Sequence, residues 1–134
     1  MSRCRFVQPR VVRLALSEGD WIDVRAELTA GEERDMYAAL RKSLNGTTAT
    51  VADFSLLNRG RLVAYLLAWS LTDADGTPVP VSEGALDQLT GHDFADMTAV
   101  LDAHIEALRE ARETEKNSRD GATDSAPISP SVAP

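Results

Sequence analysis

The stretch Leu62-Val-Ala-Tyr-Leu-Leu-Ala-Trp-Ser-Leu71 decides the fold, because nearly every side chain in it is apolar. A helix built from this run would be hydrophobic on all sides, so the rest of the domain or another chain must cover it. The run is much shorter than the roughly 20 apolar residues that a membrane span needs. Asp53 is a suitable N-cap, so we expect one helix over residues 53–71, with Gly60 as a weak point that costs about 1 kcal/mol relative to Ala.

Two strands are expected before this run. Residues 11–16 and 21–27 are apolar-rich, and Ser17-Glu-Gly-Asp20 between them supplies turn residues. The second stretch alternates with the period of a half-buried strand. An isolated hairpin is only marginally stable, so we predict a hairpin whose apolar face lies on helices. That face consists of Ile22, Val24 and Ala26, and the opposite face consists of Trp21, Asp23, Arg25 and Glu27.

Further helix signals lie on both sides of the apolar run. Thr29 and Glu32 have capping-box spacing, which predicts a helix over residues 30–44 that ends at Asn45-Gly46. Ser82 can cap a short helix over residues 83–89, and a long final helix is expected to begin near Asp93. The expected buried stripe of the first helix is Met36, Tyr37, Leu40 and Leu44, and the apolar seam of the last is Phe94, Met97, Leu101, Ile105 and Leu108.

Composition is typical of a soluble globular protein of about one domain. The net charge of −7 disfavours nucleic-acid binding, which needs clustered Lys and Arg. Cys4 is the single cysteine, which excludes an internal disulfide, and the chain shows neither a signal peptide nor a membrane span. We predict a mainly α (α+β) fold, an N-terminal β-hairpin packed on a bundle of about four helices. Residues 1–10 are expected to form a flexible basic arm, 11–116 a single domain, and 117–134 a disordered Ser/Ala/Pro-rich tail.

No catalytic or metal-binding motif stands out. Asp73-Ala-Asp-Gly76 contains half of a calcium-loop pattern, but a helix-terminating turn is the favoured interpretation, because the remaining ligands are missing. His92 and His104 have no second ligand at metal spacing, and His104 is better explained as a rim residue beside the apolar seam. There is no phosphate-binding loop and no nucleophile elbow. The sequence therefore predicts a protein that is not an enzyme, with no catalytic residue, cofactor or metal.

The aromatic residues are candidates for contact with a partner, because aromatic side chains are enriched in interaction hot spots. Trp69 is more simply explained as a core residue, whereas Trp21 shares a strand face with charged side chains, where something should cover it. If a partner groove exists, we expect it on exposed parts of the second and last helices and on the hairpin. The candidate partner-binding residues are Trp21, Tyr65, Trp69, Met97 and Leu101.

Three blocks of the chain together resemble a known family. The first is Asp20-Trp-Ile-Asp-Val-Arg-Ala-Glu-Leu-Thr-Ala-Gly-Glu32, and the second is Ala64-Tyr-Leu-Leu-Ala-Trp-Ser-Leu-Thr-Asp-Ala-Asp-Gly-Thr-Pro-Val-Pro80. The third covers residues 94–106 and includes Asp102-Ala-His-Ile105. Across residues 12–117 the chain resembles the tail assembly chaperones of long-tailed bacteriophages, particularly those of actinobacterial hosts.

The resemblance implies a cytoplasmic helper made late in infection and absent from the mature virion. Such a protein binds the tape-measure protein and keeps it soluble while tail-tube subunits assemble. A longer frameshifted form of the chain, the tail-tube protein and a second copy are further candidate partners; nucleic acid and membrane are not expected. Glu115-Lys116-Asn117 can be encoded GAA-AAA-AAC, a run of A that would allow slippage, so this chain would be the short product. The alternatives are a structural virion protein of the head–tail junction or tail, and a small host regulatory adaptor or antitoxin.

Overall fold

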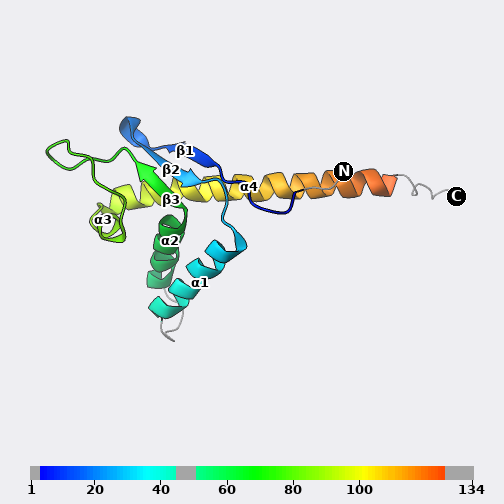
Figure 1. Ribbon diagram of the computed structural model, residues 1–134, viewed down its shortest axis with the longest axis horizontal. Coiled ribbons are helices and arrows are strands. Elements are labelled where there is room, and N and C mark those ends of the chain that lie inside the picture. The colour runs from blue at the N-terminus through cyan, green and yellow to red at the C-terminus, as the bar shows by residue number, and fades with distance from the viewer. Residues whose placement is uncertain (1–3, 45–50, 126–134) are drawn as a thin grey trace. The chain divides into compact units, whose positions relative to one another are not determined.

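The computed structural model describes residues 4–44 and 51–125, and in this part the chain forms four α-helices and a three-stranded sheet (Figure 1). The predicted α+β fold, mainly helical with an N-terminal hairpin, is confirmed. The expected helix stop at Asn45-Gly46 and the end of the chain after residue 125 lie outside the described residues. In chain order the elements are β1 (Val11–Ala15), a 3-10 turn (Ser17–Gly19), β2 (Trp21–Arg25), α1 (Ala30–Leu44), α2 (Val51–Tyr65), β3 (Leu66–Trp69), α3 (Glu83–Asp87) and α4 (Gly91–Ser125).

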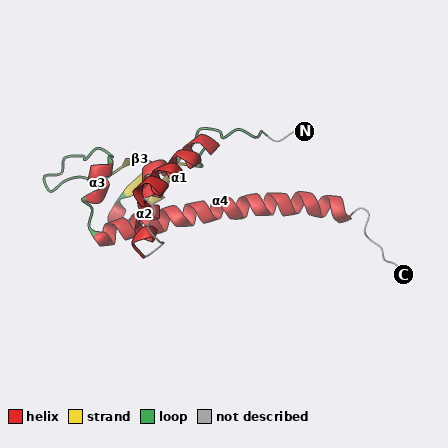
Figure 2. Ribbon diagram, turned by 90° about the horizontal axis from the view of Figure 1, so that it is seen from below, coloured by secondary structure: helices red, strands yellow, loops and turns green. Residues whose placement is uncertain are grey.

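The chain divides into two compact units, residues 1–101 and 102–134. The first unit contains the sheet, α1, α2, α3 and the first turns of α4, and the second contains the remainder of α4. Helix α4 runs from Gly91 to Ser125 (Figure 2), so it continues past residue 117, where the tail was expected to begin. Residues 109–116 are rich in Glu, Arg and Lys, and no proline lies between Leu108 and Pro127 to interrupt the helix.

Strands β1 and β2 form the predicted hairpin. They pair antiparallel from Val11 opposite Arg25 to Ala15 opposite Trp21. The turn between them needs left-handed backbone at two successive residues, with φ of 58° at Glu18 and 82° at Gly19. The Ser17 hydroxyl donates to the Asp96 carboxylate of α4 at 3.2 Å, which joins the hairpin turn to the start of that helix.

The apolar run over residues 62–71 does not form one helix, so the predicted helix over residues 53–71 is wrong in its second half. Helix α2 ends at Tyr65, and the next four residues form β3, an edge strand that pairs antiparallel with β2. In this pairing Trp69 lies opposite Ile22 and Leu66 opposite Val24. An all-apolar sequence has no period that separates a helix from a buried strand, so the open edge of β2 decides its conformation.

The core lies between the inner face of the sheet and the helices. Ile22 and Val24 of β2 are fully buried, which confirms the predicted alternation, and Leu62 of α2 is fully buried against the same core. Tyr37 of α1 was expected in the buried stripe but is 44% exposed, because the core faces Met36, one residue earlier on the helix. The other buried apolar side chains are Ala26, Leu28, Met36, Tyr65, Leu66, Trp69, Leu86, Met97 and Leu101.

The predicted caps at Thr29 and Ser82 are confirmed by side-chain hydrogen bonds, whereas the expected N-cap Asp53 is wrong, because α2 begins at Val51 and Asp53 lies inside it. Glu32 accepts from the backbone N–H of Thr29 at 2.9 Å, and the Thr29 hydroxyl accepts from the N–H of Glu32 at 3.1 Å. The Ser82 hydroxyl accepts from the N–H of Ala85 at 3.0 Å and caps α3. Helix α4 begins at Gly91, slightly before the expected Asp93, because Thr90 and Asp93 hydrogen-bond to each other across its first turn.

Two glycines are expected to respond oppositely to replacement by alanine. Gly60 lies inside α2, and a methyl group there would meet nothing within 4 Å, so Gly60→Ala should raise the free energy of unfolding by about 1 kcal/mol. Gly76 has φ of 82°, a left-handed conformation that is costly for alanine, so Gly76→Ala should lower the free energy of unfolding by about 1–2 kcal/mol. Urea titration followed by circular dichroism measures both changes. A Gly60→Ala variant less stable than the wild type would show that α2 does not pass through residue 60.

Candidate partner-binding groove

Four of the five predicted partner-binding residues belong to the core of the first unit. Met97 and Leu101 are each 1% exposed, Tyr65 is 7% exposed and Trp69 is 9% exposed. The Trp69 indole N–H donates to the backbone carbonyl of Val79, which anchors the strand β3 to the segment before α3. Burial raises the pKa of the Tyr65 phenol above its ordinary value. These four side chains are therefore mainly core residues, although Trp69 and Met97 also line hollows at the surface.

Trp21 is half-buried, and a neighbouring side chain covers it. The guanidinium of Arg13 lies 3.6 Å from the centroid of the Trp21 ring, a cation–π contact across β1 and β2. The same guanidinium donates twice to the Asp23 carboxylate, at 2.8 and 3.0 Å. On the outer face of the sheet, Trp21 is therefore covered by Arg13, which also forms a bidentate ion pair with Asp23. An unknown partner is not needed to explain why a tryptophan occurs there.

The Arg13–Asp23 pair predicts a shifted carboxyl titration. Its hydrogen bonds hold the pKa of Asp23 below the ordinary value of about 4. The lowered pKa stabilises the fold above the unfolded-state pKa, and this contribution is lost as the pH falls through the folded-state pKa. In Arg13→Gln, an NMR titration should find the pKa of Asp23 back near its ordinary value. Asp87 is the internal control, because Arg59 holds its pKa down independently; an unchanged pKa at Asp23 would refute the assignment.

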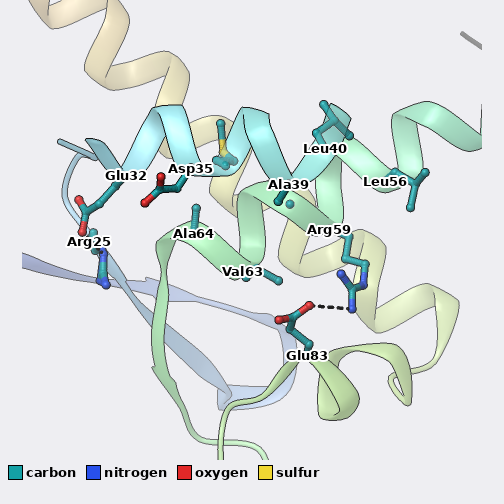
Figure 3. A pocket seen from close by; sticks show the side chains of 12 residues that line it. Arg25, Glu32, Asp35, Ala39, Leu40, Leu56, Arg59, Val63, Ala64 and Glu83 are labelled. Carbon is teal, nitrogen blue, oxygen red and sulfur yellow. Dashed lines mark hydrogen bonds and ion pairs between the residues drawn. The ribbon is translucent and has the colours of Figure 1, made fainter. Parts of the chain in front are cut away.

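An open apolar groove lies between α1 and α2, with a volume of about 320 Å³ (Figure 3). We call it the α1–α2 groove. Its apolar lining comes mainly from one face of each helix, and charged side chains stand at its ends. The apolar lining residues are Met36, Ala39, Leu40, Leu56, Gly60, Val63 and Ala64, and the polar ones are Arg25, Glu32, Asp35, Arg59 and Glu83.

Ion pairs lie at both ends of the groove, and Figure 3 marks the one between Arg59 and Glu83. At one end, the Arg25 guanidinium contacts the Glu32 carboxylate at 3.1 Å. At the other end, Arg59 of α2 contacts the Asp87 carboxylate at 2.8 Å and the Glu83 carboxylate at 3.2 Å. The second cluster joins α2 to α3. These ion pairs position the walls of the groove, and they pair the guanidinium groups of Arg25 and Arg59 with carboxylates.

A second hollow, of about 330 Å³, adjoins this groove. It shares the Arg25–Glu32 pair as a wall and continues to the segment before β1 and to Leu67 of β3. Val63 lines the α1–α2 groove, and Leu67, four residues later, lines the second hollow. Each of the two side chains is 40% exposed. The exposed part of the apolar run thus faces both hollows, while Leu62 and Leu66 point into the core.

The block that carries the family resemblance has structural roles in this domain. The Ser70 hydroxyl donates to the Asp20 carboxylate and accepts from the backbone N–H of Trp21, both at 2.9 Å, so it joins β3 to the hairpin. The Asp73 carboxylate accepts from the backbone N–H groups of Asp75 and Thr77, at 2.9 and 3.0 Å. Asp73-Ala-Asp-Gly76 was expected to terminate a helix. It forms a turn that follows β3 instead, because α2 has already ended at Tyr65.

The described residues offer little other chemistry. Within residues 4–44 and 51–125, no group of three or more His, Cys, Asp or Glu side chains is arranged to hold a metal ion. His92 is exposed, and His104 is half-buried in the second unit. None of the helices that the structure describes is long and apolar enough to cross a membrane.

The sequence-based prediction relied on large aromatic side chains, and none of these lines the groove. Small residues from both helices line the hollow and leave room in it: Ala39 on α1, and Gly60 with Ala64 on α2. Residues four apart lie on one helix face, so the Gly60/Ala64 spacing was a usable signal. No protein-family model, curated protein or solved structure matches this chain, so its sequence and the geometry of the groove carry the functional argument.

Proposed function

We propose that this chain is a tail assembly chaperone of a long-tailed bacteriophage. In this proposal it binds the tape-measure protein stoichiometrically and keeps it soluble while tail-tube subunits assemble. It acts without catalysis, in the cytoplasm of the infected bacterium, and is absent from the finished virion. The resemblance of residues 12–117 to this family motivates the proposal.

The observation that carries the proposal is the open α1–α2 groove. A chaperone of this kind needs a surface that covers apolar side chains of another chain for a limited time. The groove has an apolar lining and charged ends, the composition of sites that receive the apolar face of a helix. The excess of negative charge on the whole chain, −7, also favours solubility of a complex with an aggregation-prone client.

The test is co-expression with the tape-measure protein encoded by the same genome. The soluble fraction of the client should rise when this chain is present, and it should fall when the chain carries a groove-filling substitution such as Ala39→Phe. Ala38→Phe is the matched control, because Ala38 is the neighbouring exposed residue on α1 and does not line the groove. If the client stays insoluble with the wild-type chain and with its frameshifted form, the proposed function is wrong.

Two further observations separate the alternatives. Mass spectrometry of purified virions should not detect this chain, whereas a structural protein of the tail or of the head–tail junction would be present. The gene should lie between those of the tail tube and the tape measure, which a host adaptor or antitoxin would not. Codons GAG-AAG-AAT for Glu115-Lys116-Asn117 would remove the proposed slip site without affecting the binding proposal.

A further inference from the structure

We propose that the α1–α2 groove binds one amphipathic α-helix of the client, with a Lys or Arg at the edge of that helix placed beside Asp35. This inference rests on the proposed function, and it specifies the surface and the type of client segment.

The walls favour a helical ligand. Both walls are helices, whose central backbone N–H and C=O groups are already bonded within α1 and α2. No residue of the edge strand β3 lines this groove. An extended peptide in it would therefore find no free strand edge, and its own buried backbone groups would lack partners. A helix satisfies its backbone internally and presents apolar side chains at positions i, i+3, i+4 and i+7.

The size of the groove limits how much of the ligand enters it. A volume of about 320 Å³ is at the lower end of ligand pockets. It accommodates a few aliphatic side chains rather than a whole folded element. Ala39, Gly60 and Ala64 leave the space open, and the flexible Met36 side chain can adjust to side chains of different shape. One stripe of a single helix fits this volume.

The charges at the rim of the groove favour one sign of charge on the ligand. Arg25 is paired with Glu32, and Arg59 is paired with Asp87 and Glu83, so neither guanidinium is available to an acidic ligand. Asp35 is exposed and lines the groove, and its carboxylate has no hydrogen bond or ion pair with another of the described residues. Figure 3 shows it on α1, on the same side as Glu32. The uncompensated charge at the rim is therefore negative, which favours a basic helix.

The experiment uses the full chain and two labelled model peptides of about 20 residues. Both carry the same leucine stripe at helical spacing; one has lysines beside the stripe and the other has glutamates. Fluorescence anisotropy should show that the lysine peptide binds at least about tenfold more tightly at low salt. Equal binding of the two peptides, or tighter binding of the glutamate peptide, would overturn the assignment of the rim charge.

Two substitutions with matched controls locate the site. Ala39→Phe should weaken binding of the lysine peptide about tenfold or more, and Ala38→Phe should not. Asp35→Asn should weaken it about threefold at low salt and leave it unchanged at 1 M salt, where charges are screened. The control for charge is Glu33→Gln, on the same helix but outside the groove. Circular dichroism confirms that each variant is folded, and unaltered binding by folded Ala39→Phe would place the site elsewhere.

Co-expression then distinguishes this inference from the proposed function. If the wild-type chain and Ala39→Phe both keep the tape-measure protein soluble, the chain is a chaperone that uses another surface, and the inference fails. If the lysine peptide binds in the groove but the client stays insoluble, the groove assignment stands and the proposed function fails.

Discussion

Replacing Leu62 with alanine is expected to lower the free energy of unfolding by about 2–5 kcal/mol, whereas Val63→Ala should change it by less than about 1 kcal/mol. Leu62 is fully buried, so truncation removes apolar contacts and leaves a cavity in the core. Val63 is 40% exposed, and its loss of packing is partly offset by the better helix propensity of alanine.

Urea denaturation followed by far-UV circular dichroism measures both changes, and the slope of the transition shows whether unfolding remains cooperative. The comparison is informative because the two residues are adjacent in the sequence and equally apolar in character. Similar losses of stability at the two positions would contradict the orientation of α2. Val63→Ala has a second use, because it alters the groove lining while the core is intact, so a loss of peptide binding there is not a loss of folding.

The second large effect is expected in β3. Leu66→Glu should prevent stable folding at neutral pH, because Leu66 is 7% exposed and an unpaired carboxylate in the core costs several kcal/mol. Leu67→Glu should be tolerated with a loss of about 1 kcal/mol or less, because Leu67 is 40% exposed and points to the opposite side of the strand.

The measurement is the yield of folded protein and its melting temperature at pH 7 and at pH 5. Partial recovery of Leu66→Glu at the lower pH is expected, since protonation removes the buried charge. Leu67→Gln controls for the change of size without charge. If Leu67→Glu were the variant that fails to fold, the register of β3 on β2 would have to shift by one residue.

Local signals predicted the elements whose patterns are unambiguous. The alternation of Ile22 and Val24 with charged residues has the period of a strand, and the spacing of Thr29 and Glu32 permits only a few hydrogen-bonding arrangements, one of which caps a helix. Ser82 acts in the same short-range way. These elements depend on neighbours within a few residues, so they could be read without knowing where the rest of the chain lies.

The partner-binding residues were harder to predict because burial depends on what packs nearby. Tyr65, Trp69, Met97 and Leu101 are large and apolar, properties that suit a core and an interface equally. The α1–α2 groove depends on small residues from two helices that line it together, Ala39 on α1 and Gly60 and Ala64 on α2. Residues distant in the sequence jointly create that space.

The sequence by itself determined that this is one mainly helical α+β chain with a hairpin at its start, and that the run over residues 62–71 must be covered. Only the tertiary structure decided how the run is covered. It is divided after Tyr65 into the end of a helix and a strand, because β2 offers an unpaired edge on which the backbone of residues 66–69 can complete its hydrogen bonds. A uniformly apolar pattern has no period that favours helix or strand, so pairing with β2 determined that residues 66–69 form a strand.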